Sequence, residues 1–252
     1  MLRLLVSMAI FVLSVHLQST EAAGNQKPYE FEVIPYAAPE TLEMEVVLRN
    51  TASYPLDFEF PTSQKYDITI NDKNGNEVYL YSRGKAFLQA LQTLTLNPDE
   101  SMIWKEQWNY AHEGKRVSEG EYQINAILQA RKINGETLVA KETAEASVYI
   151  PGENPAFRQT KVSGEKGNYI VTGEARPVSG KLCYTVEDGH NELITEQPLK
   201  TNTKDWEPFK IDVSIPADKL PESGSVVLHL YERSKRDGSI IHSFPVLLEK
   251  RS

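Results

Sequence analysis

The sequence predicts an all-β protein made of two tandem antiparallel β-sandwiches that follow a signal peptide. Apolar and polar residues alternate with a period of two in many short stretches, which is typical of half-buried strands. Clusters of Gly, Asn, Asp and Pro separate these stretches at regular intervals, as they do in β-sandwiches. No stretch shows a sustained helical period. Two prolines and a glycine at residues 151–155 divide the pattern into two halves.

Residues 1–23 have the features of a secretory signal peptide. Arg3 supplies a short positive region, residues 4–15 form an apolar core, and small residues at 20–23 offer a cleavage site. The apolar run is too short for a membrane span, and no cysteine follows it to carry a lipid anchor. We expect secretion, or association with the envelope, in a Gram-positive bacterium. An uncleaved amphipathic start is the alternative.

Composition and charge narrow the classes of partner. The chain has 252 residues, of which 40% are apolar and 25% charged, which is ordinary for a globular protein. Its net charge of −8 argues against nucleic acid and anionic membranes as partners. Residues 24–150 carry 12 Lys and Arg against 19 Asp and Glu, or −7. The negative charge of this half indicates either a basic partner or an acidic surface that is only solvated.

The first half, residues 24–150, is expected to form one sandwich. A polar, proline-containing stretch at its start is expected to form a first strand. Alternation of apolar and polar residues predicts the strands that follow. A charged, glycine-containing stretch at 109–120 predicts a surface loop. The strands are expected at 42–48, 56–60, 66–70, 78–80, 102–108 and 122–128, with a last strand that ends near residue 150.

A central segment of this half carries the strongest pattern. Alternating stretches at 66–70 and 78–80 flank the turn residues Asn74 and Gly75, and this arrangement predicts a β-hairpin because the turn requires residues that tolerate positive φ. An apolar run interrupted by glycine follows at 82–96. A strand that carries two tryptophans closes the segment.

This central segment resembles the bacterial intracellular proteinase inhibitor domain called BsuPI. The resemblance covers about residues 40–132 and implies a β-sandwich that binds a subtilisin-like proteinase. The chain departs from the family in having Tyr79 where Trp is usual, and Asp99 where the family has Gly. The matching residues are Tyr66, Asp67, Asp72, Gly75, Val78, Ser82, Phe87, Leu94, Leu96, Pro98, Glu100, Trp104, Gly120 and Tyr122.

The second half repeats the β pattern with other motifs, and residues 157–248 resemble the immunoglobulin-like Gmad2 domain of bacterial sporulation and germination proteins. The two resemblances together imply two tandem immunoglobulin-like antiparallel β-sandwiches. The expected division is a signal peptide at 1–23, a BsuPI-like domain at 24–150, a linker at 151–155 and a Gmad2-like domain at 156–252. The matching residues, mostly of structural types, are Gly173, Ala175, Arg176, Tyr184, Val186, Asp188, Trp206, Phe209, Leu230, Tyr231, Glu232, Ser234, Asp237, Gly238, Pro245 and Leu247.

The sequence gives no sign of catalytic chemistry, and we expect no enzyme activity, cofactor or metal site. It lacks a nucleophile elbow, a phosphate-binding loop and a dinucleotide-binding glycine fingerprint. His112 and His190 fall in expected loops, whereas His229 and His242 fall on expected neighbouring strands, where a two-histidine metal site is the less favoured reading. Cys183 excludes an intrachain disulfide and is expected to be a small apolar strand residue.

An inhibitor requires an exposed segment that is held in its bound shape, because ordering a flexible loop opposes binding. We expect this contact loop to join the hairpin to the next element. The alternative is that Phe87, Leu91 and Leu94 are core residues and that the segment is an ordinary crossover. The expected contact residues are Tyr81, Ser82, Arg83, Gly84, Lys85 and Phe87.

Two functions therefore compete. The first is a secreted inhibitor that binds a subtilisin-type serine proteinase non-covalently through the first domain. The second is a non-catalytic adhesion or scaffold protein of the cell envelope or spore, in which two β-sandwiches bind other proteins.

Overall fold

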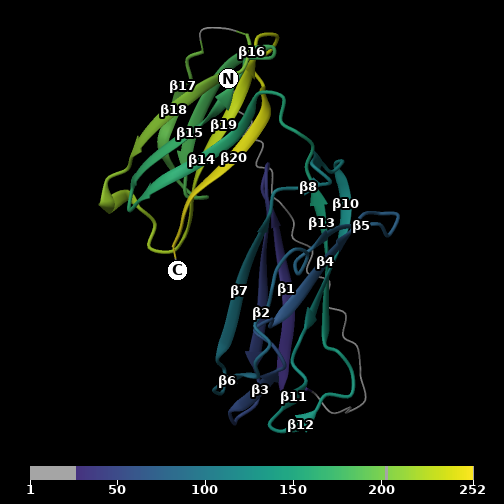
Figure 1. Ribbon diagram of the computed structural model, residues 1–252. Coiled ribbons are helices and arrows are strands. Elements are labelled where there is room, and N and C mark those ends of the chain that lie inside the picture. The colour runs from purple at the N-terminus through teal and green to yellow at the C-terminus, as the bar shows by residue number, and fades with distance from the viewer. Residues whose placement is uncertain (1–26, 202–203, 252) are drawn as a thin grey trace, which may run out of the picture.

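The computed structural model describes residues 27–201 and 204–251, so the expected signal peptide lies outside the described residues. The chain is all-β, as predicted, and its strands form two groups (Figure 1). Among the described residues, no helix has the length and apolar character needed to cross a membrane. The first group contains β1 (Tyr29–Ala37), β2 (Leu42–Asn50), β3 (Leu56–Phe60), β4 (Tyr66–Asn71), β5 (Glu77–Leu80), β6 (Gln92–Leu96), β7 (Ser101–Trp108), β8 (Ala111–His112), β9 (Lys115–Arg116), β10 (Gly120–Leu128), β11 (Lys132–Ile133), β12 (Glu136–Thr137) and β13 (Thr143–Ile150).

Two antiparallel sheets of this group, β1-β2-β7 and β13-β10-β4-β5, enclose one apolar core, and a third sheet, β12-β11-β3-β6, encloses a second core at one end. The predicted hairpin is present as β4 and β5, with Gly75 at φ 82° in its turn. Tyr66, Ile68 and Ile70 are buried, as their alternation predicts.

The second group has its own core and two facing sheets, β14-β15-β18 and β17-β16-β19-β20. Two of its strands, β14 and β17, were not predicted, because each lies at a sheet edge and alternates few apolar residues. The elements are β14 (Phe157–Glu165), β15 (Asn168–Ala175), β16 (Gly180–Glu187), β17 (Glu192–Pro198), β18 (Glu207–Ser214), a 3-10 turn η1 (Ala217–Lys219), β19 (Gly224–Ser234) and β20 (Ile240–Arg251).

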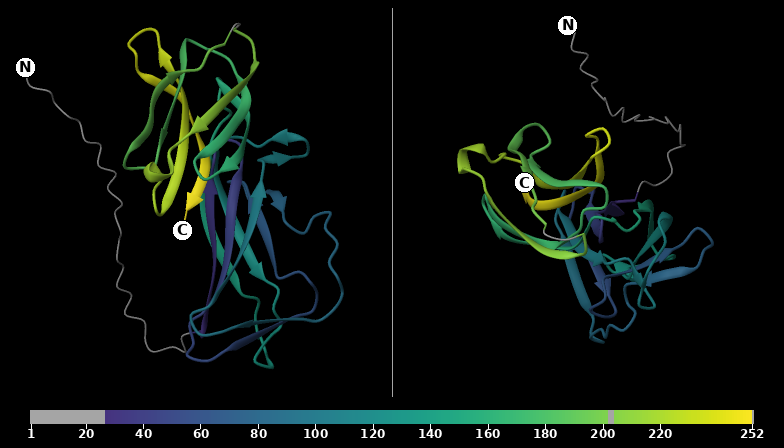
Figure 2. Two further views of the ribbon diagram at one scale, coloured as in Figure 1. Left: turned by 90° about the vertical axis from the view of Figure 1, so that its left-hand side faces the viewer. Right: turned by 90° about the horizontal axis from the view of Figure 1, so that it is seen from above.

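The two groups touch beside the 151–155 segment (Figure 2). The Glu40 carboxylate accepts hydrogen bonds from the backbone N–H groups of Gln159 and Thr160, and at 3.0 Å from the Thr160 hydroxyl. Arg116 donates to the Pro151 carbonyl at 2.8 Å. Since each apolar cluster lies wholly on one side of this segment, these facts support the predicted linker, which stays a prediction.

Several details differ from the sequence-based expectations. The expected surface loop at 109–120 contains the small β8-β9 hairpin, and Tyr110 within it is fully buried, with its hydroxyl 2.7 Å from the carbonyls of Ala38 and Thr41. His112, expected in a loop, lies in β8; it is half-buried, and its Nδ1 lies 3.0 Å from the Val78 carbonyl.

Asn50 is a fully buried polar residue at the end of β2. Its side-chain amide donates to the carbonyls of Tyr54 (2.8 Å) and Leu96 (2.9 Å), and its oxygen accepts the N–H of Ala52 (2.8 Å). The side chain therefore satisfies three backbone groups, two in the turn after β2 and one at the end of β6.

Asn50→Ala is expected to lower the free energy of unfolding by about 2–4 kcal/mol, because it removes the partners of these three backbone groups. Urea unfolding followed by tryptophan fluorescence measures the change. The control Asn97→Ala removes an exposed side chain that bonds only Glu100, and should cost under about 1 kcal/mol. Equal effects of the two variants would contradict this role of Asn50.

Glu232 on β19 is a fully buried acid of the second group. Its carboxylate accepts the backbone N–H groups of Ser179 and Gly180, and it lies 2.8 Å from Nδ1 of His242. Burial raises the pKa of Glu232, but the hydrogen bonds from His242 and from the two N–H groups outweigh burial, so the pKa lies below its ordinary value.

The lowered pKa of Glu232 implies a loss of stability in acid. A depressed carboxyl pKa stabilises the folded state above the unfolded pKa of about 4.3, and this stabilisation disappears as the pH falls through the folded pKa. The free energy of unfolding should therefore fall below about pH 4. In Glu232→Gln this part of the pH dependence should be absent; urea unfolding at stepwise lower pH tests it, and identical profiles would contradict it.

Candidate contact loop

The segment that joins β5 to β6 has the properties of a contact loop. Residues 81–91 contain turns and extended chain but no strand. Two large apolar side chains within it face solvent, with Leu88 67% exposed and Leu91 68% exposed. The alternative reading of this segment as a core crossover is therefore wrong for Leu91. Leu94, on β6, does pack against an apolar core.

Hydrogen bonds fix the loop at both ends. At its start, the Asp67 carboxylate accepts the backbone N–H of Ser82 (3.1 Å) and the Ser82 hydroxyl (2.7 Å). Further along, Ser63 and Leu88 exchange two bonds: the Ser63 N–H donates to the Leu88 carbonyl (3.0 Å), and the Leu88 N–H donates to the Ser63 hydroxyl (2.9 Å). Asp67 lies in β4 and Ser63 lies in the turn between β3 and β4, so the sandwich itself holds the loop.

Aromatic rings of the sandwich pack against the loop. The ring of Tyr81 lies 4.8 Å from that of Tyr66 and 6.2 Å from that of Phe87. Trp104 on β7 extends the stack, 5.3 Å from Tyr66. The ammonium of Lys85 lies 3.4 Å from the centroid of the Tyr81 ring, within the range of a cation–π contact. Tyr81 thus contacts both Phe87 and Lys85, and these contacts order the loop.

The Glu106 carboxylate contacts two members of this aromatic and cation–π cluster. Glu106 accepts the Tyr66 hydroxyl at 2.7 Å and pairs with the Lys85 ammonium at 3.6 Å. Burial, followed by the hydrogen bond to Glu106, raises the pKa of Tyr66, so the phenol remains protonated at any physiological pH.

The predicted contact residues lie in and just after one turn, where Arg83, Gly84 and Lys85 are exposed and the other three are half-buried. Arg83 forms an ion pair with Glu77 and is exposed, and Gly84 has φ 74°, a conformation that favours glycine. Ser82 is half-buried against Asp67. Sequence reasoning missed the exposed Leu88 and Leu91, because an apolar residue in a run does not reveal whether it faces the core or solvent.

Removing the first anchor should loosen the loop. Asp67→Ala deletes both bonds to Ser82, and we expect trypsin to cleave after Arg83 and Lys85 about five-fold or more faster, because local opening controls cleavage. Timed digestion with mass spectrometry measures the sites. The control Asp72→Ala removes a similar turn-capping carboxylate from the β4-β5 hairpin and should leave these two sites unchanged; equal acceleration would contradict the anchor role.

The histidines and the cysteine that the sequence offered as candidate site residues do not form a common site. His229 and His242 lie on the paired strands β19 and β20, but each contacts its own glutamate, Glu187 at 3.0 Å and Glu232 at 2.8 Å. Within residues 27–201 and 204–251, no group of three or more His, Cys, Asp or Glu side chains is placed to hold a metal ion. Cys183 is buried in β16, and burial raises the pKa of its thiol.

The comparisons with protein families agree with this arrangement. The family model described as BsuPI, intracellular proteinase inhibitor, matches residues 29–133, the strands that build and support the loop. The model described as Gmad2, immunoglobulin-like domain of bacterial spore germination, matches residues 153–239. The first part of the chain thus matches the BsuPI family and the second part matches the Gmad2 family. Both resemblances expected from the sequence are confirmed, in the expected order.

The shared BsuPI residues have structural roles around the loop. Asp67 and Ser82 fix its start, Asp72 accepts backbone N–H groups in the hairpin turn, and the Glu100 carboxylate accepts the N–H of Asn97 at 2.8 Å. Of the shared residues, only Ser82 and Phe87 lie in the loop itself. The resemblance therefore covers the support of the loop more than its exposed surface.

No curated protein matches the chain. Among solved structures, red sea bream transglutaminase is similar with a TM-score of 0.32 and 12% identity over 90% of this chain, which spans only 32% of that protein. The YadV chaperone has a TM-score of 0.26 and 10% identity, covering 88% of this chain and 100% of that one. Spo0M, the sporulation control protein from Bacillus subtilis, has a TM-score of 0.27 and 11% identity, covering 88% and 91%. Overlaps at these scores carry no functional argument.

Proposed function

We propose that this chain is an exported inhibitor that binds a subtilisin-type serine proteinase non-covalently through residues 81–91 of its BsuPI domain. The observation that carries the proposal is an exposed apolar loop whose ends are both fixed to the sandwich by hydrogen bonds. Such a loop loses little conformational freedom on binding. The BsuPI match, to a family described as proteinase inhibitors, supports a proteinase as the partner.

In this proposal the loop lies along the active-site cleft in an extended form. Its free backbone groups bond to the enzyme, and one apolar side chain enters a specificity pocket. Leu88 fits that role, since it is 67% exposed and its own backbone is held by Ser63. Tyr81 and Phe87, half-buried against each other, hold the loop in shape. The chain itself performs no catalysis.

Export rests on the leader features of residues 1–23 and differs from the word "intracellular" in the family description. The expected boundaries, 24–150 for the inhibitor domain, 151–155 for the linker and 156–252 for the second domain, belong to the same proposal. Fractionation of a producing culture distinguishes the locations. An exported chain is found outside the membrane with residues 1–23 removed.

Titration against subtilisin tests inhibition directly. The full chain is added in steps to the enzyme, and the residual hydrolysis of a small chromogenic substrate is measured. The expected result is a loss of activity that reaches completion near a molar ratio of one, with the inhibitor chain intact on a gel. Undiminished hydrolysis in the presence of intact chain would contradict the proposal.

A second candidate function is favoured by the Gmad2 match, whose description refers to spore germination. Here the chain is a non-catalytic adhesion or scaffold protein of the spore or envelope. Retention on purified spores or peptidoglycan, lost when residues 151–252 are removed, would support it. Retention combined with undiminished subtilisin activity would favour this candidate over the inhibitor.

A further inference from the structure

A groove runs between the two domains on the side of the molecule formed by β1, β2, β19 and β20. It consists of two adjoining cavities of about 290 Å³ and about 300 Å³, which share Tyr36, Glu43 and Leu247 in their walls. Its wall follows β1 from Ile34 and continues into the turn between β1 and β2, where Glu40 lies.

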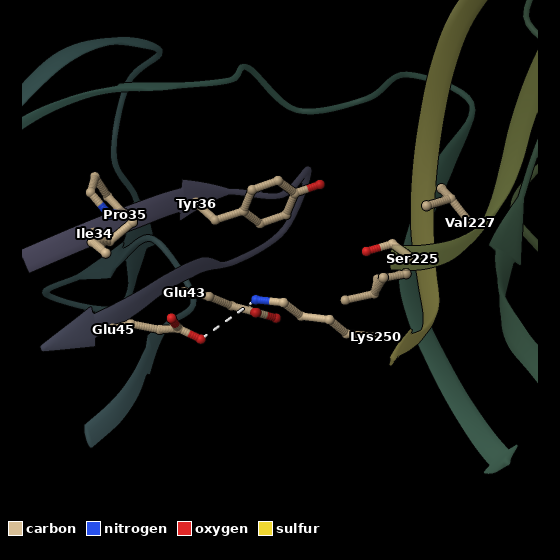
Figure 3. A pocket seen from close by; sticks show the side chains of 9 residues that line it. Ile34, Pro35, Tyr36, Glu43, Glu45, Ser225, Val227 and Lys250 are labelled. Carbon is tan, nitrogen blue, oxygen red and sulfur yellow. Dashed lines mark ion pairs between the residues drawn. The ribbon is translucent and has the colours of Figure 1, made fainter. Parts of the chain in front are cut away.

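Apolar side chains line the groove without being covered. Ile34 is 50% exposed, Tyr36 56% and Leu247 37%. These three come from β1 and β20 and border the first cavity. Figure 3 shows Tyr36 directed from β1 toward the strand that carries Ser225 and Val227. Apolar surface held open between two domains is a common feature of protein-binding sites.

The groove lining carries more negative than positive charge. Its charged lining residues are three carboxylates, Glu40, Glu43 and Glu45, and one ammonium, Lys250. Glu40 bonds to the backbone of β14. Glu45 pairs with Lys250 at 3.7 Å (Figure 3) and with Lys105 of β7, outside the groove lining, at 3.4 Å. Within the described part of the chain, Glu43 makes neither a hydrogen bond nor an ion pair.

We infer that this interdomain groove binds an extended peptide segment of a partner protein in which an apolar side chain adjoins a lysine or arginine. Glu43 receives the basic side chain, and the apolar one lies against Tyr36 and Leu247. Charge complementarity selects the occupant, because the groove carries a formal charge of −2 and one carboxylate in it is unpaired. The groove is separate from the proposed inhibitory loop, so this inference does not depend on inhibition.

Fluorescence anisotropy with defined peptides tests the inference on the full chain. The probe is a labelled heptapeptide, SLKVRLS, and its charge-reversed counterpart is SLEVELS. We expect saturable binding of the basic peptide and binding of the acidic one at least about ten-fold weaker. Raising the salt concentration from about 50 to about 500 mM should weaken the basic peptide several-fold. Equal binding of the two peptides, or no saturable binding of either, overturns the inference.

Variants locate the bound peptide. Glu43→Gln should weaken binding about 3- to 10-fold through the lost ion pair, and Leu247→Ser about ten-fold through lost apolar contact. The matched control is Glu32→Gln, an exposed acid on β1 outside the groove, and binding should stay within about two-fold of the original. An equal loss in all three variants overturns the location.

Sedimentation of the chain alone tests the main competing occupant. If a dimer forms without peptide and Glu43→Gln disrupts it, the groove belongs to a second copy and the inference is overturned. A monomer supports the inference. Leu247→Ser should weaken peptide binding but leave the inhibition of subtilisin unchanged. The two measurements therefore distinguish a failure of the groove proposal from a failure of the inhibitor proposal.

Discussion

Leu88→Asp is expected to weaken inhibition of subtilisin by about 100-fold, which is the effect of removing a central apolar anchor from an interface. An aspartate at this position places a charge in an apolar pocket, where its desolvation is unfavourable. The fold should be unaffected, because the native side chain is 67% exposed. The inhibition constant is measured by titration, with the free energy of unfolding as a check.

Val139→Asp is the matched control for Leu88→Asp. Val139 is also an exposed apolar loop residue of the first domain, and it lies beyond β12 and outside residues 81–91. Inhibition by this variant should stay within about two-fold of the original. If both variants inhibit as well as the original chain, Leu88 is not the anchor; if both fail equally, the effect comes from charge and not from the loop.

Glu232→Ala is expected to lower the free energy of unfolding of the Gmad2 domain by about 3–5 kcal/mol. The substitution leaves the N–H groups of Ser179 and Gly180 buried without an acceptor and deprives His242 of its partner. A loss of this size approaches the whole stability of many domains. Urea unfolding followed by far-ultraviolet circular dichroism measures the change.

Glu165→Ala is the control for Glu232→Ala. Glu165 is an exposed residue of β14 whose nearest charged partner, Lys166, is 3.9 Å away. Its removal should change stability by less than about 0.5 kcal/mol. A comparable loss in the two variants would show that the buried carboxylate is not the cause.

The strands with strict alternation could be predicted from the sequence, because burial of one face leaves a period-two signature. β4, β10 and β18 show this pattern, and each is at the centre of a sheet or against a core. The edge strand β17 has no such signature, since neither of its faces is fully buried. Its position depends on pairing with β16, which involves residues distant from the local pattern.

The site was harder to predict than the fold. The loop was located from its place after the hairpin, but the direction of each apolar side chain depends on contacts that residues such as Ser63 make across the sandwich. Trp206 is a second example. A tryptophan in a strand pattern is expected in the core, yet Trp206 is half-buried, and its ring contacts the guanidinium groups of Arg158 and Arg176 at 4.2 and 4.6 Å. The burial of Glu232 could not be predicted either, because the sequence does not show which backbone donors surround a side chain.

The bulge in β14 has a consequence for how the domains can be separated. Between Arg158 and Lys161 the pairing with β15 shifts, and the N–H groups of Gln159 and Thr160 bond to Glu40 of the other domain instead of to a strand. A Gmad2 domain cut free at the linker would expose these donors on a sheet edge, where another chain can pair with them. The first sandwich thus covers donors at the edge of the second that could otherwise pair with another chain.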